Sequence, residues 1–232
     1  MDQNGNPNGN PPGINLRRAA CTFVGLGTLL FLAAGTMRWA GGWMFLLEIT
    51  IGGLITEAWL ARHDPGLLAE RRTARGQAGW DRVITTIMPL LWLTWLPLMA
   101  LDAVRYQTSF VPFWLQCTGA VMIAASFYIV YRTYRENSYA APVVKIQRER
   151  GHAAVTTGPY AYVRHPIYAS GLLTYVGTPL LLGSWYGLGI VPVMAALLGL
   201  RSMMEERMLA AELDGYAEYL GRVRYRLVPM VW

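Results

Sequence analysis

The stretch GHAAVTTGPYAYVRHPIYASG, residues 151–171, leads from a polar loop into a long apolar run. The Gly-Pro pair at 158–159 interrupts regular structure, and Pro166 suits the first turn of a helix, where its missing N–H group costs nothing. Such a helix presents unpaired N–H groups and a partial positive charge beside Arg164 and His165. The segment therefore predicts a site for an anionic group such as a carboxylate or a phosphate. The alternative is an interfacial loop whose arginine and tyrosines contact lipid headgroups.

The composition indicates a membrane protein. Of the 232 residues, 54% are hydrophobic and only 15% are charged, whereas soluble domains carry about 25% charged residues. The net charge of +6 comes from basic segments between apolar runs rather than from one patch, which argues against nucleic acid as a partner. Cys21 and Cys117 both fall inside apolar runs, so we expect no disulfide framework, and no zinc-ligand spacing occurs. Residues 1–15 are polar and rich in Asn, Gly and Pro, and we expect them to be disordered.

The hydropathy pattern predicts an all-α fold with five to six transmembrane helices, each about 20 residues long. The apolar runs that predict them are Ala19–Met37, Trp43–Ala61, Val83–Val104, Phe113–Tyr131 and Ile167–Met204. The last run is too long for one crossing. Gly183-Ser184, near its middle, therefore predicts a hairpin of two helices.

The basic residues set the expected orientation in the membrane. The polar stretches 62–82 and 132–150 are rich in arginine. If these stretches lie in the cytoplasm, only two of the 20 lysines and arginines, Arg38 and Arg105, lie on the other side of the membrane. Both termini are then cytoplasmic, in what we expect to be a bacterial inner membrane. Residues 151–171 lie on the same face as the charged C-terminal segment, so the two can meet.

Carboxylates occur inside the apolar runs and where the last run ends. Glu48 and Glu57 fall in the second run, and the deeper Glu48 is either a substrate contact or a neutral structural acid. Glu205 and Glu206 follow the last run, where adjacent carboxylates can accept hydrogen bonds from hydroxyl or amino groups. Arg201 precedes Glu205 by four residues, so the alternative interpretation is an ordinary i,i+4 ion pair.

Several motifs can now be read together. The pattern G-x-Y-x-x-x-R-H-P-x-Y-x-x-G at 158–171 precedes the hairpin, the Glu-Glu pair and a closing Y-x-x-Y…R-V…R-L-V-P stretch at 216–229. V-x-I-Q-x-E-x-G-H at 144–152 leads into them, and D-P-x-L-L-A-E-R at 64–71 and Trp80-Asp81-Arg82 occur upstream. The combination resembles the isoprenylcysteine carboxyl methyltransferase family and the related phospholipid N-methyltransferases, the upstream runs being similar to bacterial members. These are integral membrane enzymes that use S-adenosylmethionine.

The resemblance implies two regions. Residues 16–143 form four transmembrane helices and a basic loop, and residues 144–232 form the cofactor-binding region, which includes the membrane hairpin. The resemblance also implies that the cofactor is enclosed by Gln147, His152, Gly158, Tyr160, Arg164, His165, Tyr168, Glu205 and Glu206. From charge alone, we expect Arg164 to suit the methionine carboxylate, the glutamates the amino or ribose groups, and the tyrosines the adenine. Arg201 and Glu205 are the expected catalytic residues, Arg201 steering a carboxylate acceptor and Glu205 serving as a base for an amine acceptor.

The acceptor is expected to be a lipophilic molecule from the bilayer, a prenylcysteine-type carboxylate or a phospholipid amine. One departure from the family concerns the entrance for this acceptor: Leu213-Asp214-Gly215 precedes Tyr216 where relatives carry an F-G pair and one residue more. Two other classes stay open, a sterol-reductase-like enzyme that binds NADPH in the same pocket and a non-catalytic membrane protein. A degenerate copy should have lost Arg164, His165 or the Glu-Glu pair, and all are present.

Overall fold

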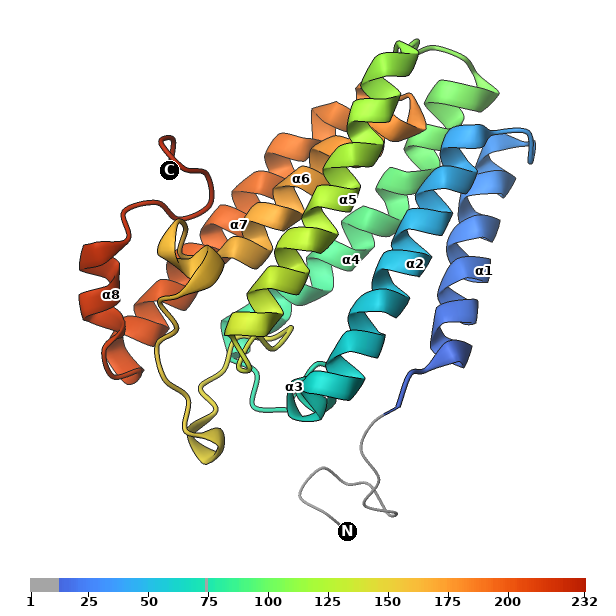
Figure 1. Ribbon diagram of the computed structural model, residues 1–232. Helices are drawn as coiled ribbons and strands as arrows, with labels where there is room; N and C mark the ends of the chain where they lie inside the picture. The colour runs from blue at the N-terminus through green and yellow to red at the C-terminus, as the bar shows by residue number, and fades with distance from the viewer. Residues whose placement is uncertain (1–12, 74) are drawn as a thin grey trace.

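The computed structural model describes residues 13–73 and 75–232, and within them the protein is a bundle of long helices (Figure 1). The long helices are α1 (Leu16–Ala34), α2 (Ala40–His63), α4 (Gly79–Ala100), α5 (Phe113–Glu136), α6 (Pro166–Leu182) and α7 (Trp185–Glu212). The short elements are α3 (Pro65–Glu70), a π-helical turn at Leu101–Arg105 that extends α4, two 3-10 turns at Arg148–Arg150 and Gly158–Ala161, and α8 (Tyr216–Arg222). The expectation of an all-α fold is confirmed for this part of the chain.

The bundle has the length and surface of an integral membrane protein. Five of its helices are long and apolar enough to cross a bilayer. The sixth, α6, has 17 residues and rises about 25 Å. Large apolar side chains such as Leu32, Ile55 and Val121 are exposed on the outer faces, as expected of surfaces that meet lipid rather than water. The predicted hairpin is confirmed, with α6 and α7 joined at Gly183-Ser184.

Close contact between α5 and α6 depends on two glycines. A Cβ on Gly119 would lie 2.5 Å from the carbonyl oxygen of Gly177, and a Cβ on Gly177 would lie 2.7 Å from the carbonyl oxygen of Gly119. Small residues at such crossings let two helix backbones approach, which is a common means of packing helices in membranes. The contact fixes α6, and with it the residues at its N-terminus.

Hydroxyl groups around one buried carboxylate hold the hairpin turn at the end of the bundle opposite α3 and α8. Asp102 accepts hydrogen bonds from Ser184 Oγ at 2.5 Å and Ser109 Oγ at 2.6 Å. Ser184 also caps α7 by accepting from the N–H group of Gly187 at 3.0 Å. Gly183 closes α6 in the left-handed region, at φ +84°, where glycine carries no steric penalty.

The basic segments gather at the other end of the bundle. There the start of α1, α3, residues 137–165 and α8 lie around the ends of the long helices (Figure 1). The segment 151–171 and the C-terminal segment therefore meet, as the arginine pattern predicts. Of residues 1–15, for which disorder is predicted, residues 1–12 lie outside the described part of the chain. Asn15 caps α1: its side chain accepts a hydrogen bond from the N–H group of Arg18 at 2.9 Å.

Candidate active site

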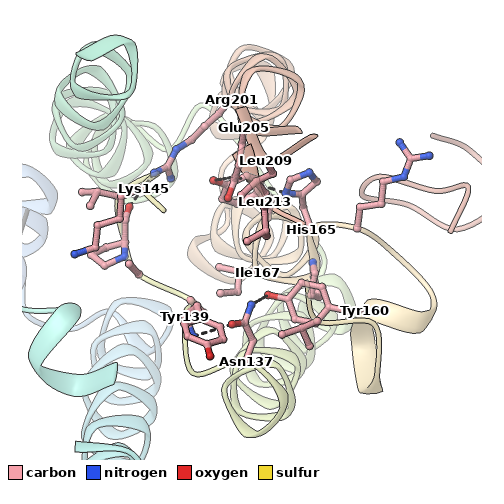
Figure 2. Close-up of a pocket in the computed structure, with 18 of the residues that line it drawn as sticks. Asn137, Tyr139, Lys145, Tyr160, His165, Ile167, Arg201, Glu205, Leu209 and Leu213 are labelled. Atoms are coloured by element: carbon pink, nitrogen blue, oxygen red, sulfur yellow. Dashed lines mark hydrogen bonds and ion pairs between the residues drawn. The ribbon is translucent and has the colours of Figure 1, made fainter. Parts of the chain in front are cut away.

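A cavity of about 350 Å³ lies at this end of the bundle, where residues 137–168 fold over the ends of α6 and α7. Arg201 and Glu205 form one side of it, and Asn137, Tyr139 and Tyr160 the opposite side (Figure 2). Of the sequence-predicted site residues, the cavity is lined by His152, Tyr160, Arg164, His165, Tyr168, Arg201 and Glu205. The segment 151–171 therefore forms part of the wall of this cavity.

Tyr168, His165 and Glu205 form one contact group on the hairpin. The Tyr168 hydroxyl donates to Oε2 of Glu205 at 2.6 Å, which joins the start of α6 to the end of α7. The His165 ring stacks on the Tyr168 ring, with centroids 5.2 Å apart and planes 2° apart. His165 Nδ1 lies 3.6 Å from the same carboxylate oxygen of Glu205. The Glu205 side chain is 22% exposed, so it stays accessible to a molecule in the cavity.

Glu206 points away from the cavity, although it is adjacent to Glu205. Successive residues on a helix differ by about 100° in direction, so the two carboxylates face different neighbours. Glu206 accepts from Arg226 Nε at 2.8 Å and from Arg164 Nη1 at 3.3 Å, and His165 Nε2 lies 3.3 Å away. This carboxylate is 6% exposed and is surrounded by cationic groups. Glu206 does not line the cavity, and its contacts join α7 to the motif and the C-terminal segment. Its predicted contact with the cofactor stays a prediction.

Arg164 ties the motif to the C-terminal segment. Its Nε donates to the carbonyl oxygen of Val223 at 2.6 Å and its Nη2 to that of Leu220 at 3.0 Å. Its Nη1 faces Glu206, so all three nitrogens already have protein acceptors. The main chain makes the same junction, because the N–H groups of Arg164 and His165 donate to the carbonyl oxygens of Tyr225 and Arg226.

Arg201 does not pair with Glu205, so the i,i+4 interpretation is wrong. Its Nε donates to Oδ1 of Asp81 at 2.8 Å, and its Nη2 donates to the carbonyl oxygen of Pro142 at 2.8 Å. The guanidinium carbon lies 5.2 Å from the centroid of the Tyr168 ring, within the range of a cation–π contact. Arg201 and Glu205 thus enclose Tyr168 from two sides.

The opposite wall is aromatic and largely uncharged. The His152 ring stacks on Tyr139 at 4.5 Å. Burial, assisted by the charge of Arg150, lowers the pKa of His152 to about 4, so this imidazole is neutral at pH 7. The Tyr160 hydroxyl accepts from Asn137 Nδ2 at 2.7 Å. Burial raises the pKa of Tyr160 above its ordinary value, which keeps the phenol protonated and able to donate a hydrogen bond.

Gln147 and Gly158 do not line the cavity. The Gln147 amide is buried and donates to the carbonyl oxygen of Tyr139 at 2.8 Å, while its oxygen accepts from Arg150 at 2.5 Å. It therefore shapes the loop that carries His152. Gly158 has φ +58°, and a Cβ there would lie 2.4 Å from Cγ of Glu136. Space and backbone conformation both require glycine at this position, and its contact with the cofactor stays a prediction.

The sequence motifs did not single out several residues that line the cavity. Asn137 and Tyr139 follow α5 directly, in a polar segment where side chains of this kind commonly cap a helix end. Lys145 also lines the cavity and pairs with Glu70 of the D-P-x-L-L-A-E-R run. Tyr216 and Tyr219 belong to the closing motif, and both reach the wall. The closing motif itself marks Tyr216 and Tyr219, and Lys145 stands at an unspecified position inside V-x-I-Q-x-E-x-G-H. For Asn137 and Tyr139, the only sequence signal is their position just upstream of the motifs.

Neither of the two acids in α2 lines the cavity. Glu57 pairs with Arg72, which follows α3. Glu48 has a buried Oε2 with no hydrogen-bond partner among the described residues. Glu48 therefore does not belong to the contact group around Glu205, and its role as a substrate contact stays a prediction.

Two comparisons with known proteins find matches for part of the chain. Residues 114–213 match the phospholipid methyltransferase family. The chain is also 32% identical over 80 residues to the Protein-S-isoprenylcysteine O-methyltransferase of Schizosaccharomyces pombe. That alignment covers 34% of this chain and 30% of the relative, so the chain matches less than a third of the relative's length. Both comparisons confirm the family resemblance that the motifs indicate.

Proposed function

We propose, on the premise of this family match, that the protein is a membrane-embedded methyltransferase. It uses S-adenosylmethionine and methylates a lipophilic acceptor. The observation that carries the proposal is the cavity at one end of the helix bundle, built largely by the matched segment, in which Glu205, Tyr168 and Arg201 face an aromatic wall. In the expected orientation this end is cytoplasmic, where the cofactor is made and both termini lie.

The residues of the cavity fit such a cofactor in size and chemistry. A volume of about 350 Å³ falls within the range of small-molecule sites. Glu205 is an acceptor for a charged amino group or for ribose hydroxyls, and Tyr160, Tyr216 and Tyr219 offer aromatic surface for a base. Arg164 lines the cavity and carries a positive charge that suits the carboxylate of the cofactor. Its nitrogens also donate hydrogen bonds to the C-terminal segment.

The bound cofactor supplies an activated methyl group, so the protein has mainly to orient the acceptor and exclude water. Tyr168 and Glu205 fix each other by their hydrogen bond, which leaves the carboxylate directed at the cavity. Ile167, Leu198 and Leu209 provide an apolar wall beside it, which keeps water away from a reacting group.

A carboxylate is the favoured acceptor group. Arg201 and Lys145 both line the cavity, and a cation there attracts a carboxylate and repels a protonated amine. A carboxylate attacks without a general base, whereas an amine must lose a proton, for which Glu205 is the candidate. A phospholipid amine N-methyltransferase is therefore the second candidate function. A sterol-reductase-like enzyme and a non-catalytic protein remain as the further alternatives.

Ligand choice tests the proposal. Purified protein in detergent is expected to bind S-adenosylmethionine or its demethylated product in a calorimetric titration, and to give no heat with NADPH. The physical reason is the carboxylate of Glu205, which lines the cavity and can accept hydrogen bonds from an amino group or from ribose hydroxyls. Binding of NADPH, with no response to either sulfur compound, would favour the reductase instead.

A further inference from the structure

Asp81 is a buried carboxylate in the first turn of α4, distant in sequence from every matched motif of the cofactor-binding region. Its side chain is 0% exposed. It accepts hydrogen bonds from Arg201 Nε at 2.8 Å, Val144 N at 2.9 Å, Gln77 Nε2 at 3.0 Å and Arg201 Nη2 at 3.3 Å. A charge so deeply buried is stable only when it is paired and fully hydrogen-bonded, as this one is. Asp81 does not itself line the cavity.

The contact fixes the position of Arg201 at the cavity wall. Nε and Nη2 meet the two oxygens of Asp81 side-on, a geometry that only a guanidinium provides. Nη2 also donates to the carbonyl oxygen of Pro142 at 2.8 Å. Among the described residues no hydrogen bond uses Nη1, and the side chain is 11% exposed and lines the cavity. One N–H pair of a clamped cation therefore remains for a molecule in the cavity.

We propose that Asp81 is a positioning residue for the methyl acceptor, one that holds the Arg201 guanidinium so that Nη1 faces the acceptor's anionic group. The inference rests on the proposed function and extends it to a residue outside the matched segment. Arginine has a long side chain with several rotatable bonds, so an unclamped Arg201 would lose entropy on meeting its ligand. The clamp removes that loss before the acceptor arrives.

The variant Asp81→Asn tests this role, because it keeps the side chain's shape and removes its charge. With an N-acetyl-S-prenyl-cysteine as acceptor, KM is expected to rise about 10–100-fold, the range for losing a charge-assisted contact. The dissociation constant for S-adenosylmethionine, measured by calorimetry, is expected to stay within about twofold, since Asp81 does not line the cavity. Gln77→Ala is the matched control: it removes another donor to Asp81 without touching Arg201, and should leave KM unchanged.

A double-mutant cycle separates positioning from a general structural role. In an Arg201→Gln background, adding Asp81→Asn should change KM by less than about twofold, because the residue through which Asp81 acts is already absent. Additive effects of the two changes would overturn the proposal, as would an equal loss of affinity for the cofactor. If Asp81→Asn fails to fold, Arg201→Lys carries the test, because lysine keeps the charge and lacks the side-on fork. A normal KM in Arg201→Lys would overturn the proposal.

Failure of the proposed function gives a different result. A wild-type protein that transfers no methyl group to any acceptor contradicts the enzyme activity, and with it the positioning role. An active wild-type protein whose KM is unchanged by Asp81→Asn contradicts the role of Asp81 alone.

Discussion

Replacing Glu206 by glutamine is expected to lower the free energy of unfolding by about 3–5 kcal/mol. The carboxylate is 6% exposed, with Arg226 Nε at 2.8 Å and Arg164 Nη1 at 3.3 Å. Removing its charge leaves these cations close together without compensation, and breaking a buried pair in this way is strongly destabilising. Denaturant or thermal unfolding in detergent micelles measures the change.

Glu212→Gln is the matched control for this variant. Glu212 lies on the same helix and pairs with Arg148 at 3.3 Å, but its side chain is 48% exposed. Exposed pairs contribute at most about 1 kcal/mol, so the control should unfold close to the wild-type protein. Equal stability of the Glu206 and Glu212 variants would contradict the account of Glu206 as a fold-holding residue.

Glu205→Ala is expected to weaken binding of S-adenosylmethionine about 10–100-fold, while the protein remains folded. The carboxylate faces the cavity and is 22% exposed, so its loss removes a charge-assisted contact to the ligand, together with the hydrogen bond from Tyr168. Contacts of this kind are worth about 1.5–3 kcal/mol. Calorimetric titration measures the affinity, and a melting curve checks the fold.

Arg132→Ala provides the control for binding. Arg132 lies at the same end of the bundle on α5, outside the residues that line the cavity. Its replacement should leave the cofactor's dissociation constant unchanged. Equal and small effects of both variants would mean that residues 151–171 and Glu205 only anchor the protein at the membrane surface.

Much of the fold follows from the sequence because hydropathy and helix breakers act locally. The length of the run Ile167–Met204 and the pair Gly183-Ser184 predict the hairpin, and the left-handed backbone of Gly183 explains why the break falls there. The helix ends are less well predicted. α5 continues to Glu136, beyond the predicted Tyr131, because a helix leaving the bilayer can continue through polar residues into water.

The site was predictable where a motif marks both partners and unpredictable where contacts join distant segments. Tyr168 and Glu205, named from their motifs, meet at 2.6 Å. The partner of Arg201 is Asp81, 120 residues away. Trp80-Asp81-Arg82 is similar to bacterial members, but no local spacing marks the pairing of Asp81 with Arg201. The different directions of Glu205 and Glu206 follow from helix geometry, but which of them faces the cavity depends on how α7 packs.

Methyl transfer by the purified protein tests the central claim most directly. The protein, reconstituted in lipid vesicles, is supplied with S-adenosylmethionine labelled in its methyl group and with an N-acetyl-S-prenyl-cysteine. The account predicts a labelled product that extracts into organic solvent and releases labelled methanol in base, as a carboxyl methyl ester does, with no product when the prenyl chain is absent. A protein that binds S-adenosylmethionine yet labels no lipophilic carboxylate, amine or thiol would contradict it.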